Sequence, residues 1–183
     1  GRKYAFWHVV FPKLFDFRNH YEKVDYKYLS REDEEGRKEF EGEVKEWIEL
    51  FYNYPSIIIY TVFNEGWGEF DPDYFYRLIK EKDKTRLVDS ASGWYYTKKT
   101  DFFSIHAYDI TCRRRKSKEK NQPFFYTEIG GLGYKVEGHS YFEGNFSHYN
   151  SKTKEELEKK YRRLFEKDIY KAKKEYGLVG TIY

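Results

Sequence analysis

The stretch from Ser56 to Gly68 constrains the fold more than any other part of the chain. It reads Ser-Ile-Ile-Ile-Tyr-Thr-Val-Phe-Asn-Glu-Gly-Trp-Gly. The apolar, β-branched run Ile57–Phe63 predicts a strand buried on both faces, as in a parallel sheet. Asn64 and Glu65 stop the run, and the glycines beside Trp67 predict a loop. We therefore expect a carboxylate at the C-terminal tip of a buried strand, where barrel enzymes carry catalytic residues.

Helical and strand patterns alternate along the chain. Three helices are expected, beginning at the capping-box segment Ser30-Arg31-Glu32-Asp33, at Asp71-Pro72 and at the second capping box, Thr153-Lys154-Glu155-Glu156. Gly177 is expected to end the last helix. Four further strands are expected at residues 86–91, 102–108, 123–128 and 178–183, and a polar loop at 139–152. This alternation predicts an α/β fold with a parallel sheet and outer helices.

Composition narrows the possible functions. The net charge is only +3, from 34 basic and 31 acidic residues, so overall electrostatics favour neither nucleic acid nor membrane binding. No run of about eighteen apolar residues indicates a membrane span, and no signal peptide is recognisable. Cys112 is the single cysteine, and with His106, His139 and His148 it matches no metal-ligand spacing. We expect no metal and no cofactor.

A second glutamate, Glu128, follows another predicted strand and precedes two glycines. In a barrel, Glu65 and Glu128 would lie at strand tips three strands apart, so their side chains would converge across the mouth. Two carboxylates in a water-poor pocket cannot both ionise freely, and one protonated and one charged group suit glycosidic bond cleavage. The alternative is that each glutamate forms a structural ion pair with a nearby Arg or Lys.

Several motifs occur in an order that resembles a known family. They are Pro55-Ser56-Ile57, the segment 63–71, the segment 85–94 containing Asp-Ser-Ala-Ser-Gly-Trp, Glu128–Gly133 and Val136–His139. They resemble the catalytic barrel of family 2 glycoside hydrolases, the β-galactosidase and β-glucuronidase family. The resemblance runs from about Tyr4 to Tyr183 and implies a partial (β/α)8 TIM barrel, roughly strands four to eight with a preceding loop and helix.

The resemblance also implies roles for individual residues. Glu65 would be the general acid/base and Glu128 the nucleophile of a retaining reaction on β-glycosides. Asn64 would bind the sugar 2-hydroxyl, and Tyr108 would hydrogen-bond Glu128. His106 precedes Tyr108 by two residues, which places it on the same strand face and so in the pocket.

The family's β-sandwich domains and first three barrel strands are not recognisable in residues 1–183. We therefore expect a single partial barrel domain from a larger enzyme, with open sheet edges at Ile57–Phe63 and Leu178–Tyr183. Such a fragment is expected to fold poorly or to lack activity alone, although the parent enzyme is active.

Other features have two interpretations each. Trp67 and Trp94 are expected either as platforms for sugar rings or as anchors of the barrel rim. The basic run at 113–120 is expected to be a solvated loop. The alternative is that it binds nucleic acid. A barrel that binds carbohydrate without cleaving it is the remaining alternative, and the presence of Asn64 with both glutamates argues against it.

Overall fold

A computed structural model describes Tyr26 and residues 31–66, 68–93, 97, 99–108, 122–141, 144 and 147–183. The chain divides into two compact units, residues 1–104 (the first unit) and 105–183 (the second unit). Trp67, Trp94, Cys112 and the basic run at 113–120 lie outside the described residues. No helix in the described part combines the length and the apolar character needed to cross a bilayer.

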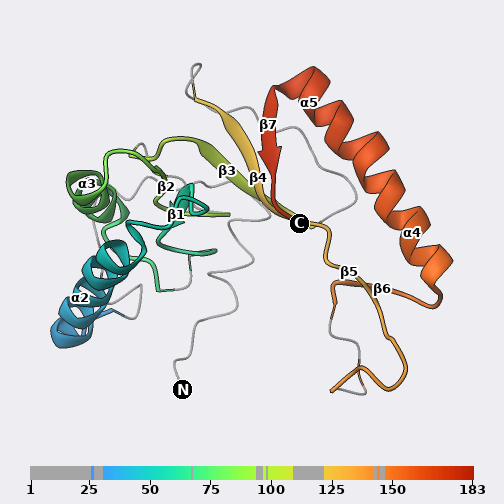
Figure 1. The fold of residues 1–183 in the computed structure, drawn as a ribbon, viewed down its shortest axis with the longest axis horizontal. Helices are drawn as coiled ribbons and strands as arrows, with labels where there is room; N and C mark the ends of the chain where they lie inside the picture. The colour runs from blue at the N-terminus through green and yellow to red at the C-terminus, as the bar shows by residue number, and fades with distance from the viewer. Residues whose placement is uncertain are drawn as a thin grey trace. The chain divides into compact units, whose positions relative to one another are not determined.

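The described part of the first unit contains two helices and a parallel strand pair, in the predicted order (Figure 1). The elements are α2 (Glu34–Phe51), β1 (Ile59–Thr61), α3 (Pro72–Lys82) and β2 (Leu87–Asp89). β1 and β2 are in register from Ile59 opposite Leu87 to Thr61 opposite Asp89. A parallel bridge between Asn64 and Ser92 extends this pairing beyond the strands, to the polar tips.

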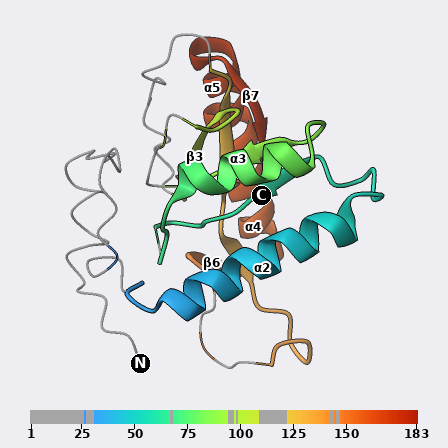
Figure 2. The same ribbon diagram turned by 90° about the vertical axis from the view of Figure 1, so that its left-hand side faces the viewer.

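The core of the first unit lies between the helices and one face of the strand pair. α2 and α3 lie next to each other (Figure 2). The buried side chains of this core are Val44, Ile48, Tyr60, Phe63, Phe70, Phe75, Ile79 and Val88. The Phe40 ring lies 5.4–5.6 Å, centroid to centroid, from those of Phe63, Phe70 and Phe75. Aromatic residues therefore join the segment after β1 to both helices.

The expectation that β1 is buried on both faces is wrong. Of its three residues only Tyr60 is buried, and Thr61 is exposed. Tyr60 and Val88 share the face that packs in the core with α2 and α3. Leu87, next to Val88 and on the other face, is 45% exposed. An apolar run thus predicted the strand correctly, but only one of its faces is covered by helices.

Of the two predicted helix starts in the first unit, the one at Ser30 needs correction and the one at Asp71 is confirmed. α2 begins at Glu34 with Asp33 as its N-cap residue, later than the Ser30 capping box predicted, and Asp33 makes no side-chain cap bond. Asp71 is the N-cap residue of α3, as predicted, but it also makes no such bond. Its carboxylate instead accepts a hydrogen bond from the Tyr26 hydroxyl at 2.6 Å. At Asp71 a tertiary contact is therefore present where a local cap bond was expected.

The second unit contains a three-stranded sheet and a long C-terminal helical segment (Figure 1). The strands β3 (Phe103–Ala107), which begins just before the unit boundary, β4 (Phe124–Ile129) and β7 (Leu178–Thr181) lie in the order β3-β4-β7, with β4 and β7 parallel. α4 (Lys154–Arg163) continues through a π-helical segment (Leu164–Ile169) into α5 (Tyr170–Tyr176).

The predicted ends of this long helix are confirmed. The Thr153 hydroxyl accepts a hydrogen bond from the Glu156 backbone N–H at 3.2 Å. Gly177 has the left-handed conformation, with φ at 72°, that a helix C-terminus favours in glycine. The polar loop expected at 139–152 is only partly correct, because β6 (Tyr149–Ser151) pairs in parallel with β5 (Leu132–Tyr134).

The described strands form separate sheets of two, three and two strands. The predicted α/β class with parallel strands is confirmed. A closed barrel is not formed by the described residues, so the assignment to barrel strands four to eight stays a prediction.

Candidate active site

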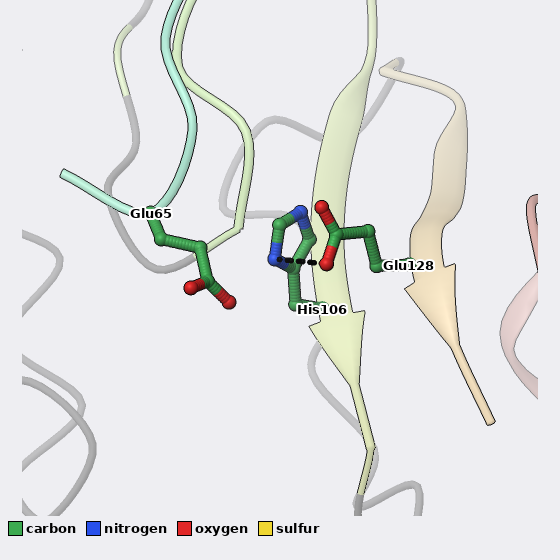
Figure 3. A group of neighbouring side chains, drawn as sticks. All are labelled: Glu65, His106 and Glu128. Carbon is green, nitrogen blue, oxygen red and sulfur yellow. Dashed lines mark ion pairs between the residues drawn. The ribbon is translucent and has the colours of Figure 1, made fainter. Parts of the chain in front are cut away.

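Glu65 follows β1 and lies in a turn with an unusual backbone (Figure 3). Its φ is 58°, in the left-handed region, and Gly66 follows with φ at 72°. The Glu65 N–H donates to the Ser92 carbonyl at 2.9 Å, and the Ser92 N–H donates to the Phe63 carbonyl at 2.9 Å. A non-glycine residue in this conformation costs on the order of 1–2 kcal/mol. The paired strand tips therefore hold Glu65 in a strained conformation.

Arg31 secures the loop that follows Glu65. Its Nε donates to the Gly68 carbonyl at 2.5 Å, and its guanidinium lies 5.5 Å from the Phe70 ring centroid. Gly68 has φ at +68°, and a Cβ there would lie 2.6 Å from the Arg31 guanidinium. Glycine is therefore favoured at 68 by its backbone conformation, and it lets the guanidinium approach closely. Sequence reasoning missed Arg31, because 37 residues separate it from Gly68.

Two carboxyl groups of the first unit, those of Glu69 and Asp89, are buried. Glu69 is 0% exposed and Asp89 is 1% exposed. The Ser104 hydroxyl donates to Asp89 Oδ1 at 3.1 Å. Neither Glu69 oxygen, nor Asp89 Oδ2, has a hydrogen-bond partner within the described part of the chain. Sequence analysis selected neither residue, although Glu69 lies in the quoted 63–71 motif and Asp89 in the 85–94 motif.

Burial governs the protonation of this pair. Burial, with a smaller contribution from the Asp89 charge, raises the pKa of Glu69 to about 8. Burial also raises the pKa of Asp89 to about 7, against hydrogen bonds from Ser104, Ser92 and the Ala91 backbone. At neutral pH Glu69 is therefore mostly protonated and uncharged.

The second unit brings two predicted residues, Tyr108 and His106, next to the predicted Glu128. The Tyr108 hydroxyl donates a short hydrogen bond to Glu128 Oε2. His106 Nδ1 lies 3.4 Å from the same oxygen (Figure 3). His106 is buried, whereas a third of the Glu128 side chain is exposed, at 33%. β3 and β4 are neighbours in the sheet, so residues near the C-terminal ends of both strands meet here.

His148 is a fourth member of this group. Its ring stacks on that of Tyr108, with centroids 4.2 Å apart and an interplanar angle of 26°. A Cβ at Gly131 would lie 2.8 Å from the His148 ring, so glycine makes room for it. Sequence analysis considered His148 only as a metal ligand. His148 directly precedes β6, a strand that the sequence pattern did not predict.

The predicted site residues thus divide between the units. Asn64 and Glu65 lie at the tip after β1 in the first unit, where Asn64 is exposed. His106, Tyr108 and Glu128 lie together in the second unit. The convergence of Glu65 with Glu128 involves both units and stays a prediction, as do the roles assigned to these residues. Trp67 and Trp94 lie outside the described residues.

Comparison with protein families gives a match that covers both glutamates. The model of the family described as glycosyl hydrolases family 2, TIM barrel domain, matches residues 10–171. The chain belongs to this family. The resemblance read from the motifs is therefore confirmed, and family 2 membership makes the chain a glycoside hydrolase domain with a carbohydrate substrate. A search of curated proteins found no match.

Proposed function

We propose that this family 2 domain cleaves β-glycosides with retention of configuration, with Glu128 as nucleophile and Glu65 as general acid/base. The observation that carries the proposal is the Tyr108–Glu128 hydrogen bond. A nucleophilic carboxylate must be ionised, and a phenol that donates to it stabilises the ionised form. The Tyr108 hydroxyl can also hold the carboxylate in one orientation toward the anomeric carbon.

The reaction would take place in two displacements. In the first, a Glu128 oxygen bonds to the anomeric carbon while the glycosidic C–O bond breaks and Glu65 gives its proton to the leaving oxygen. In the second, the Glu65 carboxylate takes a proton from water, the water oxygen bonds to the anomeric carbon, and the ester to Glu128 breaks. Asn64 would hydrogen-bond the sugar 2-hydroxyl in both steps.

The strained backbone at Glu65 also supports its assignment. Non-glycine residues with positive φ are uncommon, and they gather at functional sites where the surroundings determine the conformation. Here the surroundings are the Ser92 carbonyl and the strand pairing behind it. A role in an ion pair alone would not require this conformation.

Chemical rescue tests the two roles. Full-length protein would be assayed on aryl β-D-glucoside, galactoside, mannoside and glucuronide, as wild type, Glu65→Gln and Glu128→Gln, with and without azide. We expect both variants to lose activity, and azide to yield an α-glycosyl azide with Glu128→Gln and a β-glycosyl azide with Glu65→Gln. The control Glu46→Gln changes an exposed glutamate on α2 and should match wild type.

Two outcomes would contradict the proposal. Activity retained in either variant would remove that residue from the assigned role. A wild type that binds sugars and cleaves none would favour a carbohydrate-binding barrel without catalysis.

A further inference from the structure

The buried carboxyl groups of Glu69 and Asp89 have no part in the reaction proposed above. Both Glu69 oxygens and Asp89 Oδ2 lack a hydrogen-bond partner within the described part of the chain. Burying a charged carboxylate without donors is costly, so such groups call for an explanation beyond packing. A proton held between the two carboxyls would supply the missing donor, because a protonated carboxyl donates through its O–H.

Asp89 is connected to the backbone that holds Glu65. It is the last residue of β2, and its carboxylate accepts hydrogen bonds from the Ser104 and Ser92 side chains. The Ser92 carbonyl accepts from the Glu65 N–H, and the Ser92 N–H donates to the Phe63 carbonyl, both at 2.9 Å. Ser92 therefore joins the buried carboxyl to the turn that carries the proposed acid/base.

Glu69 approaches the same carboxyl from the other end of this turn. It lies four residues after Glu65 and directly after Gly68, whose carbonyl accepts from Arg31 Nε at 2.5 Å. The Asp89 charge acts on Glu69 in addition to burial. Both ends of the turn therefore depend on the tip of β2, one through backbone hydrogen bonds and the other through the charge of Asp89.

The protonation of the pair controls the stability of this arrangement. Burial raises the pKa of Glu69 to about 8 and that of Asp89 to about 7, so the pair retains a proton near neutral pH. Above pH 8 two buried charges would repel each other in surroundings that exclude water. Admitting water relieves this repulsion. The turn at Glu65, with φ at 58°, has backbone strain to release and is the segment we expect to open.

A pH effect of the pair has to be separated from that of other charged groups. Several charged side chains on the surrounding elements have partners of their own, as Tyr26–Asp71, Asp73–Thr97, Lys80–Asp101 and Arg86–Asp83. Arg31 lies on the Gly68 carbonyl, and the α2 side chains in this core are apolar. On β3, His106 pairs with Glu128. Glu69→Gln changes none of these groups, so it isolates the buried pair.

We propose that Glu69 and Asp89 are positioning residues for the acid/base Glu65, which hold its turn in place while they share a proton and release it when both are ionised. The inference rests on the proposed function, in which Glu65 transfers the proton. Its consequence is that alkaline pH inactivates the enzyme through this buried pair.

Hydrogen exchange of the full-length protein tests the positioning without any need for activity. Protection factors, corrected for the pH dependence of intrinsic exchange, would be measured from pH 6 to 9 on peptides covering 62–70 and 88–93, with 40–51 of α2 as reference. In wild type, protection at the two strand tips should fall about tenfold relative to α2 as the pH rises. In Glu69→Gln and Asp89→Asn this ratio should change less than about twofold. The control Glu81→Gln, exposed on α3, should behave as wild type.

Kinetics give a second readout. A 2,4-dinitrophenyl glycoside of the preferred sugar has a leaving group that needs no proton, so the second displacement, with Glu65 as general base, limits kcat. Because a general base stays active once deprotonated, alkaline pH should lower this kcat only where Glu65 is displaced. We expect wild-type kcat to fall about tenfold from pH 7 to 9, and that of Glu69→Gln to fall less than about twofold.

The outcomes separate this inference from the catalytic roles. Equal loss of protection at the tips and in α2, or an alkaline fall of kcat that persists in Glu69→Gln, overturns the positioning role while catalysis stands. If wild type cleaves no glycoside, the catalytic proposal fails and the protection ratio decides. A wild-type ratio that falls with pH and stays constant in Glu69→Gln then supports the hold on the turn, and a ratio that is constant in wild type overturns it.

Discussion

Replacing Glu69 with glutamine should stabilise the protein at neutral pH and have little effect near pH 4. Burial raises the pKa of Glu69 from 4.5 to about 8, so the folded state holds its proton more tightly than the unfolded state does. Below pH 4.5 both states are protonated and the shift has no effect. As pH rises from there to 8, folding must take up a proton or bury a charge, and stability falls.

The magnitude follows from the width of this window. pH 7 lies about 2.5 units above the unfolded-state pKa and still below the folded-state pKa. At 1.36 kcal/mol per unit, the charged-state penalty lowers the free energy of unfolding by about 3 kcal/mol. Glutamine has the same shape and carries no charge, so it removes this cost.

Urea unfolding at pH 4.5, 6, 7 and 8 measures the effect. The difference in unfolding free energy between Glu69→Gln and wild type should grow from near zero at pH 4.5 to about 3 kcal/mol at pH 7. Glu46→Gln, on the exposed side of α2, should show a small difference that does not change with pH. A Glu69→Gln difference that is the same at every pH would refute the argument, because burial of the carboxyl would then not control its protonation.

Three further predictions concern single side chains. Tyr108→Phe removes the donor to Glu128, so kcat/KM should fall by about ten- to a hundredfold at unchanged melting temperature, as expected for a bond to a charged group. Arg86→Met leaves the buried Asp83 without its 2.5 Å ion pair and should cost about 3–5 kcal/mol in urea unfolding, with part of the loss recovered by adding Asp83→Asn. Gly68→Ala forces a side chain onto a positive φ and against a guanidinium, so it should lower both melting temperature and activity, whereas Gly42→Ala, with no atom within 4 Å of the added Cβ, should not.

The elements of this fold were predictable where the signal is local. The apolar run before Glu65, the capping box at Thr153 and the glycine at 177 each indicate structure through neighbouring residues, and each element lies where expected. The burial of β1 was not predictable in the same way. The run Ile57–Phe63 is apolar throughout, but α2 and α3 cover only the face that carries Tyr60.

The candidate site was predictable to a similar extent. Alternation along one strand predicted that His106 and Tyr108 share a face. Tyr108 donates to Glu128, as the resemblance implied, and His106 lies 3.4 Å from the same carboxylate. The missed residues have partners far away in the sequence. His148, just before the unpredicted β6, stacks on Tyr108 from 40 positions along the chain, and Arg31 reaches Gly68 across 37 residues. Contacts of this kind leave no periodic pattern.

The left-handed backbone of Glu65 has an evolutionary consequence. Glycine, or to a lesser extent asparagine, adopts this conformation at lower cost, so replacing the glutamate would relieve strain at the tip of β1. Stability alone therefore selects against the residue to which we assign proton transfer. In a gene copy that is no longer selected for catalysis, Glu65 should be among the first residues to be substituted. The core residues Phe63 and Phe70 should be retained for longer.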